Sequence, residues 1–153
     1  MGYSVYSVAK TFCEKKDWQL SNLSLNKLTY LAHMVKLGRT SGEAGLVDNA
    51  YEAWDYGPVS PALYHKAKAF GSGYVGNIFH QYESVVDEDD LSVIQGVLDG
   101  VGDMIPGQLV AITHTEVGAW YKNYEPGVKG SIIPDEDILT EYNTRASRQP
   151  EPA

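Results

Sequence analysis

The sequence predicts a mainly α-helical fold: a single compact multi-helix domain with a small extended or β-hairpin element. Apolar residues recur at positions i, i+3, i+4 and i+7 along most of the chain, which is typical of amphipathic helices. Candidate strands are few and short, at residues 46–54 and 78–86. With 153 residues, 43% hydrophobic and 21% charged, the chain has the size and composition of one ordinary globular domain.

Two helices are predicted before residue 40. Apolar spacing indicates a first helix from about Ser4 to Lys16, and a connector over residues 17–22 follows it. Ser24 is expected to cap a second helix and Gly38 to end it. The apolar stripe of this second helix is wide, because Tyr30 and other large residues flank its main row. This helix should therefore be central in the core.

Residues 51–61 are the most distinctive stretch, Tyr-Glu-Ala-Trp-Asp-Tyr-Gly-Pro-Val-Ser-Pro. The Gly57-Pro58 step excludes a continuous helix here and favours an extended arm that turns sharply, with Trp54 and Tyr56 at the bend. Ser60 is expected to cap a short helix that begins at Pro61, reaches Phe70 and stops at Gly71. The aromatic residues have two explanations: core packing around a turn, or a recognition surface.

The second half of the chain predicts further helices. The acidic run 87–90 suits a helix start, because negative side chains there complement the helix dipole, and an apolar stripe continues to Val101. A metal site is the alternative for this run, but it lacks the spacing and glycine of an EF-hand loop. Pro106 or Gly107 should open another helix through Thr113, and Pro134 a short final one. We expect one domain over residues 1–143 and a flexible tail over 144–153.

Composition excludes several functional classes. The formal net charge of −8, with no stripe of basic residues, argues against nucleic-acid binding. No apolar run approaches the roughly 20 residues of a membrane span, and the N-terminus has no signal-peptide pattern. The lone cysteine, Cys13, excludes an internal disulfide and suits a reducing environment. We therefore expect a cytoplasmic protein without a membrane partner.

No pattern in the sequence points to catalysis. The four histidines lie at positions 33, 65, 80 and 114, and none belongs to a nucleophile motif. His114-Thr-Glu116 has the spacing of a zinc-deaminase motif but lacks the downstream Cys-x-x-Cys. His114 is better explained as a buried hydrogen-bonding residue than as a base. We expect no enzyme activity, no cofactor and no bound metal.

Three segments in order resemble one family. They are Leu25-Asn-Lys-Leu-Thr-Tyr-Leu-Ala32, Tyr51-Glu-Ala-Trp-Asp-Tyr-Gly-Pro-Val59 and Thr113-His-Thr-Glu-Val-Gly-Ala-Trp120. Together they resemble the Panacea, or SocA-like, antitoxin domain family of bacterial and phage genomes, over about residues 3–143. The residues that carry the resemblance are Lys27, Tyr30, Trp54, Gly57, Pro58, His114 and Trp120.

The resemblance implies an antitoxin that neutralises a cognate protein toxin, encoded by an adjacent gene, by direct binding. It also implies a variant of this role, in which the antitoxin delivers its toxin to a host protease. Two other functions stay open: an enzyme acting on a small molecule in an aromatic cleft, and a phage accessory protein that binds a host factor.

We expect the residues around the turn to have two different roles. Trp54, Gly57 and Pro58 should hold it, while Tyr56, Val59 and Tyr64 should contact the partner. Lys27 has two explanations, as a motif residue or as a solvated side chain near a helix start.

Overall fold

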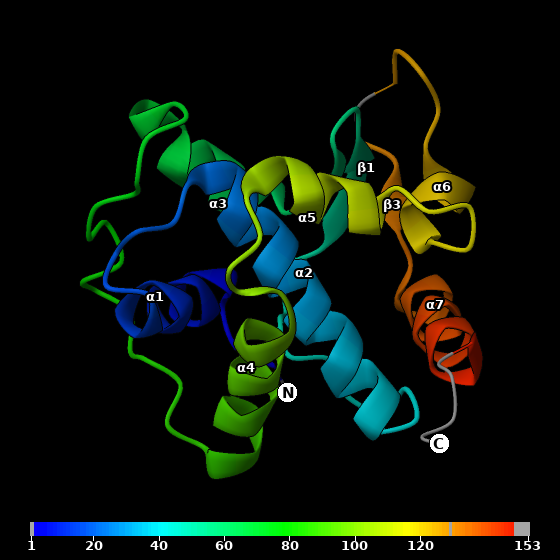
Figure 1. Cartoon of the computed structure of the whole chain (residues 1–153), viewed down its shortest axis with the longest axis horizontal. Coiled ribbons are helices and arrows are strands. Elements are labelled where there is room, and N and C mark those ends of the chain that lie inside the picture. Colours follow the sequence, from blue (N-terminus) through cyan, green and yellow to red (C-terminus); the bar gives the residue numbers. More distant parts are fainter. Residues whose placement is uncertain (1, 129, 149–153) are drawn as a thin grey trace.

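The computed structural model describes residues 2–128 and 130–148 of the chain (Figure 1). One helix, α2 (Asn22–Arg39), runs through the middle of the molecule and contacts most of the other elements. Helices α1 (Val5–Lys15) and α4 (Glu88–Val101) pack on one side of it, and α7 (Asp135–Arg148) packs on the other. The predicted mainly α-helical fold is confirmed, and so is the central place of the second helix.

Helix α1 forms where the apolar spacing predicts it. The Oγ atom of Ser4 accepts a hydrogen bond of 3.1 Å from the backbone N–H of Tyr6 and caps the helix. The apolar face is fully buried and includes Cys13, whose thiol pKa is raised to about 12, mainly by burial. Cys13 therefore acts as a small core side chain.

Both predicted ends of α2 are wrong. Ser21, not Ser24, is the N-cap, and its Oγ accepts the N–H of Ser24 at 3.2 Å. At the other end the helix passes through Gly38 and finishes at Arg39. Gly38 serves a different purpose, since a Cβ atom there would lie 2.3 Å from the ring of Tyr142 in α7. The glycine allows two helices to approach closely.

A three-stranded antiparallel sheet provides the small β element. Strands β1 (Tyr51–Trp54) and β2 (Gly57–Val59) form a hairpin, and β3 (Ile132–Ile133) pairs with the other edge of β1. The sequence pattern does not predict β3, which has only two residues. The strand considered for residues 78–86 is wrong: its backbone is irregular, and Val85 N–H donates to Thr11 Oγ1 of α1 at 2.9 Å instead of to a strand.

The next helices largely follow the sequence prediction. Helix α3 (Pro61–Ala67) is capped by Ser60 and continues as the 3-10 turn η1 (Lys68–Phe70) before Gly71. Asp87 caps α4, as the acidic run predicts. Asp90 is not a solvated residue of the helix start. It is only 8% exposed and accepts hydrogen bonds from Lys36 and Tyr3.

The last elements are α5 (Pro106–Thr113), α6 (Ala119–Asn123) and α7. Helix α7 does not fray at Thr144, since it continues to Arg148. Arg145 holds this extension by donating to Glu141 Oε2 at 2.8 Å and to the carbonyl of Ile112 in α5. Residues 149–153 of the expected tail lie outside the described residues.

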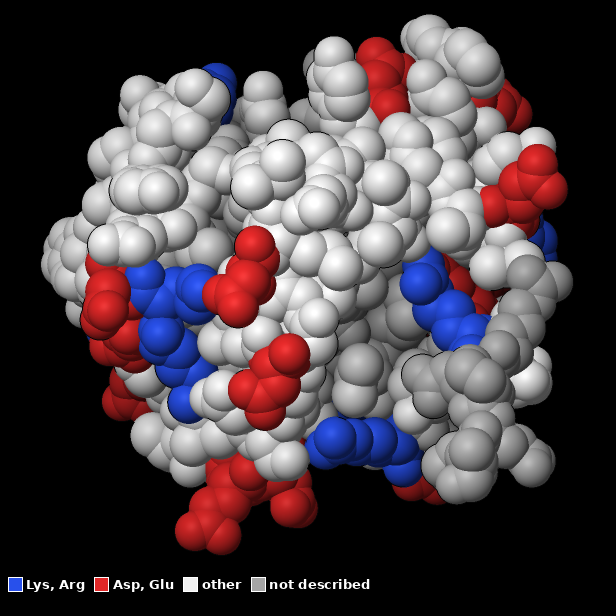
Figure 2. Space-filling view, in the orientation of Figure 1, with Lys and Arg blue, Asp and Glu red and all other residues white. Residues whose placement is uncertain are grey.

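Acidic and basic side chains are interspersed on the face seen in Figure 2, around a broad uncharged area over α5. Figure 2 shows no basic stripe on this face. Among the described residues, no helix combines the length and apolar character needed to cross a bilayer.

Candidate functional site

The hairpin tip is the exposed part of the second family segment. Asp55 and Tyr56 join β1 to β2, and Tyr56 is 70% exposed. Behind the tip, Gly57 has a φ of +108°, which side-chain-bearing residues rarely adopt. A Cβ atom at Gly57 would lie 3.0 Å from Thr113 Oγ1 and 3.2 Å from Lys27 Nζ. The glycine therefore allows both the turn and the close contact of the hairpin with the helices behind it.

Lys27 holds the second strand to α2. Its side chain is fully buried, and Nζ donates a hydrogen bond of 2.8 Å to the carbonyl oxygen of Pro58. Burial lowers the pKa of this amine to about 7. The solvated explanation of Lys27 is therefore wrong, and the residue belongs to the support of the hairpin.

A row of amides on α2 extends this support towards α3. Asn26 Oδ1 accepts the backbone N–H of Ser60 at 2.8 Å. Asn26 Nδ2 donates to Asn22 Oδ1 at 2.8 Å, and Asn22 Nδ2 donates to the carbonyl of Tyr64 at 3.1 Å. These bonds join α2 to the first turn of α3, at the backbone of Ser60 and of Tyr64.

Trp120 holds the hairpin from its other side. Its Nε1 donates a hydrogen bond of 2.6 Å to the carbonyl of Trp54. His114 stacks on Trp120, with centroids 3.8 Å apart and the planes 9° apart, and Tyr124 also stacks on it at 4.6 Å. The Tyr124 hydroxyl donates to Asp55 Oδ1 at 2.6 Å. We call Asn26, Lys27, Trp120 and Tyr124 the hairpin clamp.

The surroundings of the half-buried His114 favour the neutral form of its ring. Burial and the nearby Lys27 lower the pKa of His114, in that order, while the backbone of Tyr56 acts in the opposite sense. A neutral ring suits the stack on Trp120, because it adds no buried positive charge beside Lys27.

Tyr30, the remaining family-motif residue, acts further away. Its hydroxyl donates a hydrogen bond of 3.0 Å to Glu141 Oε1, and the carboxylate is 1% exposed. The same oxygen accepts the backbone N–H of Ala119 at 2.9 Å. Glu141 thus fixes the first residue of α6, and α6 carries Trp120 into the clamp.

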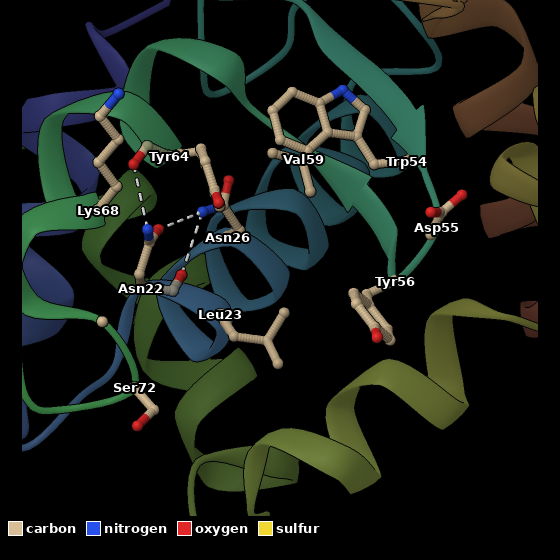
Figure 3. A pocket seen from close by; sticks show the side chains of 11 residues that line it. Asn22, Leu23, Asn26, Trp54, Asp55, Tyr56, Val59, Tyr64, Lys68 and Ser72 are labelled. Carbon is tan, nitrogen blue, oxygen red and sulfur yellow. Dashed lines mark hydrogen bonds between the residues drawn. The ribbon is translucent and has the colours of Figure 1, made fainter. Parts of the chain in front are cut away.

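An open groove of about 400 Å³ lies beside the tip (Figure 3). Trp54 and Tyr64 form part of its wall in an edge-to-face arrangement, with centroids 4.9 Å apart. Tyr64 is 37% exposed, whereas Val59 is 4% exposed and contributes to the buried side of the groove. The lining residues are Asn22, Leu23, Asn26, Trp54, Asp55, Tyr56, Val59, Tyr64, Lys68, Gly71 and Ser72.

The structure separates the predicted residues into two groups. Tyr56, Val59 and Tyr64, expected to contact a partner, line the groove together, and the half-buried Trp54 lines it too. Gly57 and Pro58 form the start of the second hairpin strand. Lys27 and Trp120 hold the hairpin through hydrogen bonds to its carbonyls, and His114 stacks on Trp120.

Sequence reasoning missed Asn22, Asn26, Asp55 and Lys68 as lining residues. A usable pattern existed for the amides. Asn22 and Asn26 are four residues apart and therefore share one face of a helix that is otherwise rich in buried residues.

The groove offers aromatic and aliphatic surface, and its amides already bond within the protein. Within the described part of the chain, no three His, Cys, Asp or Glu side chains are placed to hold a metal ion. The arrangement is suited to binding an apolar group next to a protruding aromatic tip.

Comparison with known proteins identifies the family. The model of the family described as "Antitoxin SocA-like, Panacea domain" matches residues 25–121, more than half of the chain. A curated relative, antitoxin SocA of Caulobacter vibrioides (strain NA1000 / CB15N), is 37% identical over 117 residues, which is 68% of this chain. The chain spans 60% of the length of that relative. No solved structure matches. The three family segments, which contain the hairpin and the clamp residues Asn26, Lys27 and Trp120, fall within the matched range, and the chain belongs to the SocA-like Panacea antitoxin family.

Proposed function

We propose that this protein is an antitoxin that neutralises a cognate protein toxin by direct binding, through the hairpin tip and the groove beside it. Family membership supports the antitoxin role. One observation carries the choice of surface: family segments far apart in the sequence hold a tip on which Tyr56 is 70% exposed, next to a groove with aromatic walls.

The clamp favours binding by a rigid surface. The hairpin is tied to α2 by Lys27 and to α6 by Trp120, so little conformational freedom remains to be lost when a partner binds. Exposed tyrosine beside tryptophan is the type of surface that dominates interface energetics. In the proposed mechanism this surface covers the active or target-binding face of the toxin.

Delivery of the toxin to a host protease is a second mechanism by which an antitoxin could act after binding. Steric occlusion predicts that toxin protein persists in rescued cells. Delivery predicts that the toxin disappears in rescued cells and accumulates when the protease is deleted. Immunoblotting of the toxin in both strains separates the two mechanisms.

The groove also has the size of a small-molecule site. However, the two basic groups best suited to acid–base chemistry, Lys27 and His114, do not line it. This placement supports binding over catalysis as the proposed function.

The test is co-expression with the protein encoded next to this gene. We expect the neighbour to arrest growth alone, growth to resume when this chain is co-expressed, and the two proteins to co-purify. A neighbour that is harmless alone, or that stays toxic in the presence of this chain, would remove the support for the proposal.

A further inference from the structure

We propose that the groove binds an extended segment of the toxin with one large apolar side chain between an acidic and a basic residue. The acidic residue faces Lys68 and the basic residue faces Asp55. This inference rests on the proposed function and specifies the chemistry of the partner.

The apolar anchor follows from the state of the polar groups in the groove. Asn22 and Asn26 line it, but their amides bond to each other, to Tyr64 and to Ser60. A polar ligand group placed against them would lose water and gain little in return. An apolar side chain, by contrast, gains from burial against Leu23 and Val59.

The charged residues lie at opposite ends of the groove (Figure 3). Lys68 stands at one end and Asp55 at the other, and both are exposed. Asp55 accepts the hydroxyl of Tyr124, but neither residue forms an ion pair within the described part of the chain. An occupant with opposite charges at its two ends would therefore be favoured and oriented along the groove.

The position of the groove favours a segment of a protein over a free small molecule. Tyr56 lines the groove and also projects from the molecule with 70% of its surface exposed. A ligand confined to about 400 Å³ would leave this ring in water, whereas a folded partner would cover tip and groove together.

The test uses the full-length chain and a phage-displayed library of random heptapeptides. We expect enriched peptides to share one Leu, Met, Phe or Trp with an acidic residue on one side and a basic residue on the other. Either chain direction is acceptable. The best peptide is then synthesised, and its Kd is measured by calorimetry.

Charge reversal identifies the two ends. Lys68→Glu should raise the Kd of the peptide at least tenfold. Replacing the acidic residue of the peptide by Lys should restore binding to this variant. Asp55→Lys should behave in the same way with the basic peptide residue. Lys15→Glu, the same change at an exposed lysine of α1, is the matched control and should leave the Kd unchanged. Thermal melts establish that each variant is folded.

Several outcomes would overturn the inference: enriched peptides without the charge pattern, equal effects of Lys68→Glu and Lys15→Glu, or no restoration by the reversed peptide. Concentration-dependent dimerisation that Lys68→Glu abolishes would instead assign the groove to a second copy. The growth assay keeps the proposed function separate. If wild type, Lys68→Glu and Asp55→Lys all neutralise the toxin equally, the groove inference fails and the antitoxin role stands. If the charge-swap experiment succeeds but the neighbouring gene product is not neutralised, the antitoxin role fails.

Discussion

The Nζ atom of Lys27 lies 2.8 Å from the carbonyl oxygen of Pro58, 31 residues further along the chain, and Lys27 is fully buried. This hydrogen bond joins the central helix to the second strand of the hairpin. Keeping a buried amine protonated costs free energy, so the stability of the folded chain should depend on pH.

Lys27 should make the protein more stable as the pH rises above neutrality. Its pKa is about 7 in the folded chain and near its ordinary 10.5 in the unfolded chain. Between these values the unfolded chain binds the extra proton, so the free energy of unfolding should rise by about 1.4 kcal/mol per pH unit from this group alone. Urea denaturation at pH 7, 8 and 9 measures the slope. Lys27→Met should flatten it and Lys15→Met should not. Equal slopes for wild type and Lys27→Met would contradict the lowered pKa of Lys27.

Trp120→Phe should loosen the hairpin without unfolding the domain. The substitution keeps an aromatic ring for the stack with His114 but removes the hydrogen bond to the carbonyl of Trp54. We expect a loss of about 1 kcal/mol in unfolding free energy. Amide hydrogen exchange should also quicken at Ala53 of β1, whose N–H donates to the carbonyl of Ser131, the residue before β3. Trp18→Phe, on a half-buried tryptophan outside the clamp, is the control, and unchanged exchange at Ala53 in Trp120→Phe would argue against the clamp.

Local chemistry explains the elements that the sequence predicts well. Ser4, Ser60 and Asp87 each accept a backbone N–H at a helix start, and Pro61 occupies the first position of α3, where its missing N–H costs nothing. These interactions span two or three residues, so a single sequence contains all the partners.

Tertiary contacts explain the failures. Gly38 is of a residue type that often ends a helix, but α2 runs one residue further, to Arg39, and the glycine instead makes room for the ring of Tyr142 in α7. Strand β3 exists because Ile132 and Ile133 meet β1, about eighty residues earlier, and two residues carry no periodicity of their own. The burial of Lys27 depends on a carbonyl supplied by the hairpin. In each case the deciding partner is distant in the sequence.

In the candidate site, too, the sequence predicts individual residues but not the tertiary contacts between them. The sequence identifies Tyr56 and Tyr64 as possible contact residues, and both line the groove. It assigns Trp54 to the turn alone, because the packing of α3 that places Tyr64 edge-on against this ring cannot be read from residues 51–61.

Glu141→Ala should be among the most destabilising single changes. The buried carboxylate accepts hydrogen bonds from Tyr30, the N–H of Ala119 and Arg145. Removing it leaves these donors, one of them charged, without their acceptor, at a cost of roughly 3–5 kcal/mol. Glu141→Gln keeps an acceptor oxygen and should cost less. Chemical denaturation of both variants measures the difference, and a cost below about 1 kcal/mol for Glu141→Ala would refute this role.

Salt should slow the association of this chain with its toxin if the acidic surface attracts a basic partner. The formal net charge is −8, and the Debye length falls from about 10 Å at 0.1 M to about 3 Å at 1 M ionic strength. Stopped-flow association rates at the two salt concentrations provide the measurement. An on-rate that does not change with salt would leave apolar contact as the driving term.

Tyr56→Ala should separate binding from folding. The ring is 70% exposed, so its removal should change the melting temperature little, while the loss of an interface anchor should weaken toxin binding by about 2 kcal/mol, or roughly 30-fold. Trp54→Ala should affect both properties, because this half-buried ring packs against Tyr64 and also lines the groove. Tyr121→Ala removes a tyrosine of α6 that is 54% exposed and lies outside the groove lining, so it should change neither property.

The decisive comparison is a thermal melt beside a neutralisation assay for these three variants and Tyr64→Ala. Tyr64 is 37% exposed and forms part of the groove wall, so Tyr64→Ala should resemble Tyr56→Ala, with a somewhat larger loss of stability. The tip and groove would lose their assigned role if Tyr56→Ala and Tyr64→Ala both fold and neutralise like wild type. They would also lose it if both variants unfold, because the loss of neutralisation would then follow from loss of the fold. If Tyr121→Ala alone abolishes neutralisation, the binding surface lies on α6 instead.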